Sequence, residues 1–173
     1  GNANDESGSG YHGTVNGATP GTDRYGTAAR AYSFDGVNDK IDAPMPLTPA
    51  KVTVSAWFKA DSDGTSGTRE IVNRYHSAPG YSQWNLSWQY DDSGKYNRVF
   101  NRLVFAEAAA SDHFSGSLEK NTWHHAITTF DGQNQKLYIN GVLASRVSRN
   151  GNTLTYTHHN LNIGYYVAAG DWF

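Results

Sequence analysis

The sequence predicts an all-β fold in which two antiparallel sheets pack face to face. Apolar and polar residues alternate along residues 51–60 and 123–130, which is the period of a half-buried strand. Asn140-Gly141 favours the positive φ angles of a two-residue hairpin turn. Aromatic residues make up 13% of the chain and glycines number 18, which is typical of a twisted sheet with many turns. Because each half-apolar sheet needs a second sheet to cover it, we expect a sandwich.

The first half of the chain predicts a loop, a strand-turn-strand unit and one long strand. Residues 1–30 are mostly small and polar, and we expect them to form loops. Residues 31–41 predict a strand, a turn at an Asp-Gly pair and a return strand. Three prolines between residues 43 and 50 exclude regular pairing there. Residues 51–60 then form the clearest single strand of the sequence.

The second half predicts a series of further short strands. We expect them over residues 70–75, 83–90, 99–108, 123–130, 136–139, 154–156 and 161–166. Within 83–90, Trp84, Leu86 and Trp88 share one face and are expected in the core. Asn85, Ser87 and Gln89 point the opposite way. No stretch has a convincing helical period, and no stretch repeats.

Composition excludes several functional classes. The net charge is only -2, and no basic excess points to nucleic acid or to an anionic membrane surface. The chain has no Cys and therefore no disulfides. No apolar run approaches the ~20 residues of a membrane-spanning helix. The length fits one domain, residues 1–173.

Residues 4–8 concentrate oxygen-bearing side chains beside flexible glycines. Asn4, Asp5 and Ser7 are hard ligands, and Gly8 allows the backbone to fold back. Ca²⁺ takes six to eight oxygen ligands, including backbone carbonyls, and such a loop supplies several of them. A disordered leader is the alternative interpretation, because loops of this composition are commonly plain turns.

The adjacent histidines His124 and His125 invite a metal-site interpretation, which strand geometry excludes. Neighbouring residues of a strand point to opposite faces, so the two rings cannot bind one ion. We expect one ring to be buried and hydrogen-bonded and the other to face outward. The same argument applies to His158 and His159, and no zinc site is expected.

Five stretches, taken together and in order, resemble the laminin-G-like domains of the concanavalin A-like lectin/glucanase superfamily. They are NDESGSGYHGTVNGA, SFDGVNDKI, VTVSAWFKA, TWHHAITTFDGQNQKLYINGVL and LNIGYY, beginning at residues 4, 33, 52, 122 and 161. The resemblance implies a two-sheet antiparallel jelly roll. It also implies a secreted bacterial binding module, attached to a larger enzyme or adhesin, that commonly holds one Ca²⁺ ion.

The sequence departs from this family pattern at both ends. The family carries a strand before the opening loop, and here the chain begins after it. The family also has a closing strand, and here the chain stops at 171–173, where that strand would begin. The two strands are neighbours in the family's sheet, and their loss would expose a sheet edge. We therefore expect the sequence to be a fragment, a processed form or part of a longer chain.

The resemblance also guides the candidate calcium ligands. We expect Asp5 to supply the carboxylate, with Asn4 and the backbone carbonyls near Ser7 and Gly8 beside it. Asp35 and Asp171 are further candidate ligands. The ion would have a structural role, pinning the irregular ends of the domain.

Catalysis receives less support than binding. The superfamily's glucanases need two carboxylates about 5 Å apart on one strand face. None of the glutamates has a carboxylate two residues away on a predicted strand. Jelly-roll polysaccharide lyases instead use Tyr, His, Arg and Gln, and residues 74–76 with Gln83 offer these types. An enzyme acting on polysaccharide therefore stays open as an alternative.

For ligand binding we expect planar polar groups beside aromatic rings. The candidates in and around the loop after residue 73 are Arg74, Tyr75, His76 and Tyr81, and on the strands they are Trp57, Asn85 and Gln89. The strand residues are expected to line a concave groove together. We conclude that the chain is a non-catalytic carbohydrate-binding or adhesion module at the cell exterior. Its partners would be a glycan or cell-surface polysaccharide and neighbouring domains, and a purely architectural domain is the second alternative.

Overall fold

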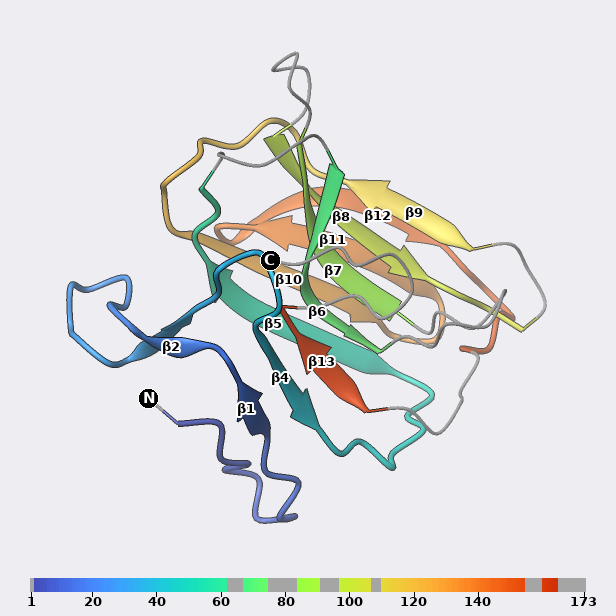
Figure 1. Ribbon diagram of the computed structural model, residues 1–173. Helices are drawn as coiled ribbons and strands as arrows, with labels where there is room; N and C mark the ends of the chain where they lie inside the picture. The colour runs from blue at the N-terminus through green and yellow to red at the C-terminus, as the bar shows by residue number, and fades with distance from the viewer. Residues whose placement is uncertain are drawn as a thin grey trace.

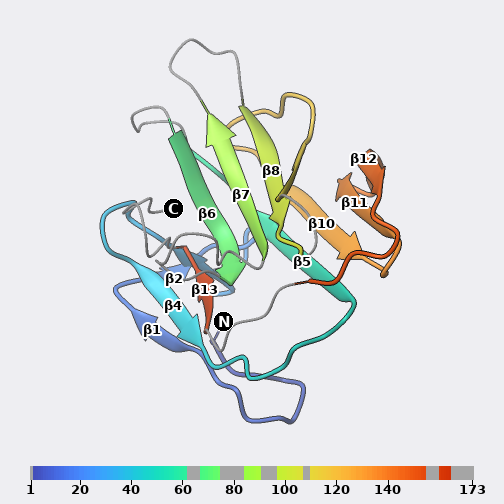
Figure 2. The same cartoon turned by 90° about the vertical axis from the view of Figure 1, so that its right-hand side faces the viewer.

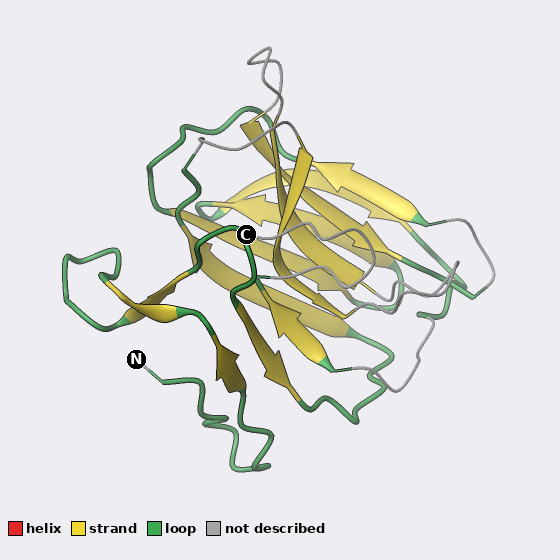
Figure 3. Cartoon of the chain, in the orientation of Figure 1, coloured by secondary structure: helices red, strands yellow, loops and turns green. Residues whose placement is uncertain are grey.

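The structure is a computed structural model that describes residues 2–61, 67–74, 84–90, 97–106, 110–154 and 160–164. Within these ranges every regular element is a strand, as Figures 1 and 3 show. The bounds are β1 Thr14–Asn16, β2 Thr19–Gly21, β3 Ala31–Ser33, β4 Lys40–Ala43, β5 Val52–Phe58, β6 Gly67–Arg74, β7 Trp84–Tyr90, β8 Asn97–Leu103, β9 Ser111–Phe114, β10 His124–Phe130, β11 Asn134–Ile139, β12 Val142–Ser148 and β13 Leu161–Ile163. No helix among the described residues is long and apolar enough to cross a membrane.

The larger sheet has seven strands in the order β1-β4-β13-β6-β7-β8-β9. Every neighbouring pair in it is antiparallel. β13 comes late in the sequence yet lies between β4 and β6, so the sheet joins the two ends of the domain (Figure 1). A bulge in β6 between Glu70 and Val72 lets Ile71 as well as Val72 reach the core.

The smaller sheet has four strands in the order β12-β11-β10-β5, and Figure 2 shows it as a second layer. It contains the strands predicted at 51–60, 123–130 and 136–139, and β12 follows the predicted turn at Asn140-Gly141. β2 and β3 form a separate two-stranded sheet. The all-β, two-sheet antiparallel sandwich predicted from the sequence is therefore confirmed.

The turn between β11 and β12 has the chemistry that the sequence predicted. Asn140 has a φ of 51° and Gly141 a φ of 83°, as a type I′ turn requires. The Asn140 side chain also accepts a hydrogen bond from the backbone N–H of His125 at 2.9 Å. This contact ties the turn to β10 as well as to its own strands.

The core lies between the two sheets and includes the three residues predicted from residues 83–90. Trp84, Leu86 and Trp88 are each 2% exposed or less. They face Ala126, Phe130 and Leu137 of the smaller sheet, which are equally buried. Burial of a large apolar side chain contributes about 1.5–3 kcal/mol. The inward-facing apolar residues of β7 therefore provide much of the hydrophobic packing between the two sheets.

Three predictions about strands need correction. Residues 31–41 hold two strands as predicted, but β3 pairs with β2 and β4 pairs with β1 and β13, so they form no hairpin with each other. The strand expected over 99–108 ends at Leu103, and a new strand, β9, begins at Ser111. The 1–30 loop contains two short strands, β1 and β2, whose three-residue length gives almost no periodic signal.

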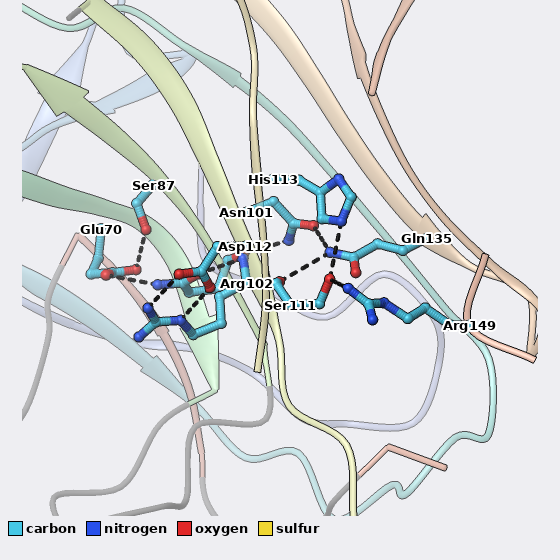
Figure 4. A network of polar contacts seen from close by, with 10 residues as sticks. Glu70, Ser87, Asn101, Arg102, Ser111, Asp112, His113, Gln135 and Arg149 are labelled. Carbon is cyan, nitrogen blue, oxygen red and sulfur yellow. Dashed lines mark hydrogen bonds and ion pairs between the residues drawn. The ribbon is translucent and has the colours of Figure 1, made fainter. Parts of the chain in front are cut away.

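A polar seam crosses the core between the larger and smaller sheets (Figure 4). The Asn101 side-chain oxygen accepts hydrogen bonds from the Thr128 hydroxyl and the Gln135 amide, both at 2.8 Å. The Asn101 amide donates to the Asn85 carbonyl at 2.7 Å. All three of Asn101, Thr128 and Gln135 are at most 1% exposed. Buried polar groups of this kind fix the register of one sheet on the other, because any slip leaves them unpaired.

A cavity of about 1270 Å³ lies between β5 and the β2–β3 ribbon. Its lining reaches the core at Trp88 and Ile163. Among the described strands, β5 pairs only with β10, and the inward side chains of β5 before Phe58 are only half-buried. This edge of the smaller sheet is therefore less completely packed than its β10 and β11 strands.

We predict that Asn101→Ala destabilises the fold by about 2–4 kcal/mol, because it leaves two buried donors unpaired. Chemical denaturation measures the change. Asn16→Ala, the same substitution at an exposed position, is the control and should change the free energy of unfolding by less than about 0.5 kcal/mol. Equal effects of the two substitutions would contradict a structural role for the seam.

Candidate functional site

The outer face of the seven-stranded sheet carries a row of polar residues, one from each strand. Cross-strand pairing places them directly opposite one another in register. We call this row the polar ladder, and its members are Thr14, Asp42, Asn162, Asn73, Asn85, Arg102 and Asp112. Each lies on the side of its strand opposite the core, because side chains alternate along a strand.

The middle of the polar ladder forms a buried polar floor. Asn73, Asn85 and Asn162 are at most 6% exposed. Beside them, the Glu70 carboxylate is 3% exposed and accepts hydrogen bonds from the Asn85 amide at 3.1 Å and the Ser87 hydroxyl at 2.7 Å. A buried carboxylate needs such donors, because burying it without partners is costly. Figure 4 shows the Glu70 carboxylate with its hydrogen bond to Ser87.

An accessible part of this face lies at its β8–β9 end, and we call it the edge cluster. Its members are Gln89, Arg98, Phe100, Arg102, Asp112 and Phe114. Gln89, Arg98, Arg102 and Phe114 are half-buried, Asp112 is exposed, and Phe100 lies buried among them.

Charged and aromatic groups alternate within the edge cluster. Arg102 donates two parallel hydrogen bonds to the Asp112 carboxylate, each 2.7 Å long. Arg98 donates two hydrogen bonds to the Gln89 side-chain oxygen, at 2.8 and 2.7 Å. The Arg98 guanidinium also lies 3.8 Å from the ring centre of Phe114, which stacks on Phe100 with 5.2 Å between ring centres. These contacts hold planar hydrogen-bonding groups beside an aromatic ring on a rigid sheet.

This arrangement suits recognition of a flat polyhydroxylated ligand. Guanidinium, carboxylate and amide groups each offer paired donors or acceptors at fixed spacing. The aromatic ring offers an apolar surface next to them. At the opposite end of the same face, Lys40 and Asp42 form an ion pair at 2.9 Å, so both ends of the polar ladder are internally neutralised.

The structure does not bring all the predicted ligand residues together. Trp57 is 44% exposed on the outer face of the four-stranded sheet, where β5 pairs with β10. Asn85 and Gln89 lie on the outer face of the other sheet. The single groove predicted for these three residues is therefore wrong, because the core separates them.

Trp57 already has ring partners within the chain. It stacks on His125 at 4.8 Å between ring centres, and the Arg24 guanidinium lies 4.5 Å from its ring centre. A sugar would have to compete with these contacts. His125 faces outward as predicted for one histidine of the pair, whereas His124 is buried and bonds the Glu119 carbonyl at 2.8 Å.

Two other predicted residues are buried in structural contacts. Arg74 is fully buried and donates to the Leu47 and Met45 carbonyls at 2.5 and 2.8 Å. These bonds fasten the proline-rich connection of residues 44–50 to β6. Asn85 belongs to the buried floor described above. Only Gln89 of the predicted strand residues joins the edge cluster. Tyr75, His76 and Tyr81 lie outside the described residues.

The opening loop is organised by Asp5. Its carboxylate accepts hydrogen bonds from the backbone N–H groups of Ser7 at 2.8 Å and Tyr11 at 2.9 Å. The Ser7 hydroxyl, followed by these two N–H groups, holds the pKa of Asp5 at about 2. Asp5 is therefore ionised throughout the physiological pH range. Asn4 and Gly8 lie in the same loop, and Gly8 has a φ of 84°.

The fit of a calcium ion to the predicted ligands is partial. Asp35 caps its own turn by accepting from Val37 and Asn38 N–H groups, at 2.8 and 3.2 Å. Within the described ranges no group of three or more acidic or histidine side chains gathers as a metal site. The opening loop thus supplies the ionised carboxylate of Asp5, the carboxylate of Glu6 and neighbouring hydroxyl and amide oxygens. Asp171 lies outside the described residues.

Sequence reasoning missed most of the edge cluster. The signal was present in Arg98, Phe100 and Arg102, which alternate along β8 on the face opposite Val99 and Leu103. The predicted strand began two residues after the start of β8 and ran past its end. β9 was not predicted, so Asp112 and Phe114 had no assigned neighbours.

A family model described as the concanavalin A-like lectin/glucanases superfamily matches residues 35–173. No curated protein sequence matches the chain.

Three solved structures with similar folds are distant in sequence. Domain 4 of AbnA, an extracellular arabinanase from Geobacillus stearothermophilus in complex with arabinotriose, has a TM-score of 0.63 at 16% identity, over 99% of this chain and 80% of that one. The sialidase CBM40 from Ruminococcus gnavus, bound to α2,3-sialyllactose, has a TM-score of 0.56 at 13% identity, over 71% and 68%. The botulinum neurotoxin serotype D binding domain has a TM-score of 0.65 at 19% identity, over 94% and 41%.

The chain thus spans less than half of that toxin domain, which it covers to 41%. At these identities the similarity establishes the fold. The fold is a jelly-roll sandwich shared with domains that bind carbohydrates or receptors.

We predict that Arg74→Met lowers the free energy of unfolding by about 2–4 kcal/mol, because the fully buried Arg74 side chain loses its charge-assisted hydrogen bonds to the carbonyls of Met45 and Leu47. Arg146→Met, at an exposed position on β12, should change it by less than about 0.5 kcal/mol. Thermal and urea denaturation measure both. A stable Arg74→Met protein that has lost ligand binding would instead favour the ligand role predicted from the sequence.

Proposed function

Because the chain belongs to the concanavalin A-like lectin/glucanases superfamily, we propose that it is a non-catalytic glycan-binding module whose edge cluster contacts the sugar. The observation that carries the proposal is the fixed array of Arg98, Arg102, Asp112 and Gln89 around Phe114 on an accessible sheet face. The sugar-bound arabinanase and sialidase domains support a carbohydrate ligand at the level of fold.

The distribution of carboxylates supports binding rather than hydrolysis. Retaining glycosidases place two carboxyl groups about 5–5.5 Å apart, and inverting ones about 6.5–9.5 Å apart. On the described outer face, Glu70 is separated from Asp42 by one intervening strand and from Asp112 by two. At ~4.8 Å per strand these separations are roughly 10 Å and 14 Å. Both exceed the distances that the two mechanisms need.

We infer further that the module works outside the cell, as a carbohydrate-binding or adhesive part of a bacterial protein. The glycan or cell-surface polysaccharide would be its partner, and neighbouring domains of the same polypeptide would carry other activities. The superfamily membership and the kinds of domain that share the fold support this context.

We predict that Arg102→Ala and Phe114→Ala each weaken glycan binding at least tenfold. Arg102→Ala removes a hydrogen bond from a charged group, which contributes about 1.5–3 kcal/mol, and Phe114→Ala removes the aromatic surface on which the sugar would pack. A glycan array identifies the ligand, and calorimetry then measures the affinity. Arg146→Ala, on the outer face of the other sheet, is the matched control and should bind normally.

Three results would contradict this proposal in different ways. An array without any bound glycan would remove the proposed function. Binding that survives both substitutions but is lost in Trp57→Ala would place the site on the other sheet. Release of sugar products by the isolated chain would show that it is an enzyme.

We also propose that one Ca²⁺ ion binds at the opening loop, with Asp5 as its carboxylate ligand and a structural role. The ionised state of Asp5 and the neighbouring oxygens of Asn4 and Ser7 support this proposal. A bound ion stabilises the folded state by RT ln(1 + [L]/Kd). We therefore expect millimolar CaCl₂ to raise the Tm above its value in EDTA by about 2 °C or more. Asp5→Asn should remove the increase, and an unchanged Tm in the unmodified protein would contradict the ion.

A further inference from the structure

A histidine joins the outermost strands of the two sheets. His113 of β9 points into the sandwich opposite Asn101 and is 5% exposed. One ring nitrogen, Nδ1, shares a hydrogen bond of 2.6 Å with the Ser145 hydroxyl of β12. The other, Nε2, shares a hydrogen bond of 3.0 Å with the Ser111 hydroxyl. Both ring nitrogens are therefore engaged, and one of them reaches the other sheet.

A positive charge lies near this ring, with the Ser111 hydroxyl between the two groups. Arg149, just after β12, donates a hydrogen bond from Nη2 to the Ser111 hydroxyl (Figure 4). Ser111 thus lies between the guanidinium and the imidazole. When His113 is neutral, the hydroxyl hydrogens of Ser111 and Ser145 can be arranged to satisfy both ring nitrogens. When His113 is protonated, both of its ring nitrogens must donate hydrogen bonds. The Ser111 hydroxyl oxygen must then accept from two cations, the imidazolium of His113 and the guanidinium of Arg149.

No described carboxylate faces this ring to balance a second charge. Asp112 follows Ser111 on the opposite side of β9, where it pairs with Arg102. The neutral side chains of Asn101 on β8 and Gln135 on β11 face the same interior. On β12, Arg146 points away and donates to Asn134. Protonation of His113 would therefore place two positive charges together in a partly desolvated site.

We propose that His113, Ser111, Ser145 and Arg149 form an acid-sensitive clasp between the two sheets. At neutral pH the uncharged imidazole joins β9 to β12. On acidification a proton on the ring places a second positive charge beside Arg149, and the β9–β12 side of the sandwich loosens.

The pH dependence has a defined sign. Burial, followed by the charge of Arg149, lowers the pKa of His113 below the usual value, and Asp112 only partly opposes this. In the unfolded chain a histidine titrates near its model value of about 6.5. Between that pH and the lower pKa of the folded state, His113 binds a proton in the unfolded chain but not in the folded chain. Stability is thus lost as the pH falls from about 6.5 through the lower folded pKa, and it levels off once both states are protonated.

The same four-residue strand serves the clasp and the edge cluster. Ser111 and His113 point inward from β9, whereas Asp112 and Phe114 point outward. Loosening β9 would therefore disturb Asp112 and Phe114, so glycan affinity should fall in the same pH range. This last step rests on the proposed function, whereas the clasp itself does not.

The test compares Tm at pH 7.5 and 5.0 for three proteins. The parent protein should lose about 2–4 °C more than His113→Gln, because an amide can bond both serines without taking up a proton. His12→Gln, the same substitution at an exposed histidine, should keep the parent's full loss. Equal losses in the parent and in His113→Gln would overturn the proposal.

NMR titration of the unsubstituted protein gives an independent result that does not depend on a variant folding. The His113 ring proton should titrate below pH 6.5, and Arg149→Gln should move its midpoint upward. Hydrogen exchange at pH 5.0, corrected for intrinsic rates, should accelerate in 111–114 and 142–149 more than in 124–139. A midpoint at or above 6.5, or uniform exchange across these strands, would refute the clasp. Loss of glycan binding without these changes would count against the clasp and leave the proposed function standing.

Discussion

In-register pairing of the seven-stranded sheet is the constraint on which the rest of this structure depends. With a side-chain period of two, one register assigns Leu86, Val99 and Leu103 to the core and Asn85 and Arg102 to the outer face. A slip of one residue would reverse both assignments at once. The apolar core and the polar ladder are therefore two results of the same pairing. The strands themselves hold the side chains of the edge cluster in place.

Polar contacts fix how the second sheet sits on the first. Asn101 connects β8 to both β10 and β11, and His113 connects β9 to β12. Apolar packing alone would tolerate some sliding between the layers, whereas unpaired buried amides would not. The side of the sandwich near β9 and β12 is thus held by directional bonds. The opposite side, along β5, borders a cavity instead.

The fold was predictable because its signals are local. The alternation of 52–58 and 124–130 and the Asn140-Gly141 turn each specify structure within a few residues. The short strands β1, β2 and β9 were missed, since three or four residues carry too little periodicity. The site was harder to predict. Alternation along the strand correctly predicted that Gln89 faces outward. Trp57 was predicted to share a groove with Gln89, although the core lies between the two residues.

The sequence by itself determined that the chain is an all-β sandwich, that Trp84, Leu86 and Trp88 are core residues and that His124 and His125 cannot bind one metal ion. Only the tertiary structure decided which strands are neighbours. β13 lies between β4 and β6, and this order, which no local pattern encodes, completes the polar ladder. It also decided that Arg74 is buried and bonds the carbonyls of Leu47 and Met45. The physical reason is that alternation sets the face of a side chain, whereas its partners depend on pairings distant in sequence.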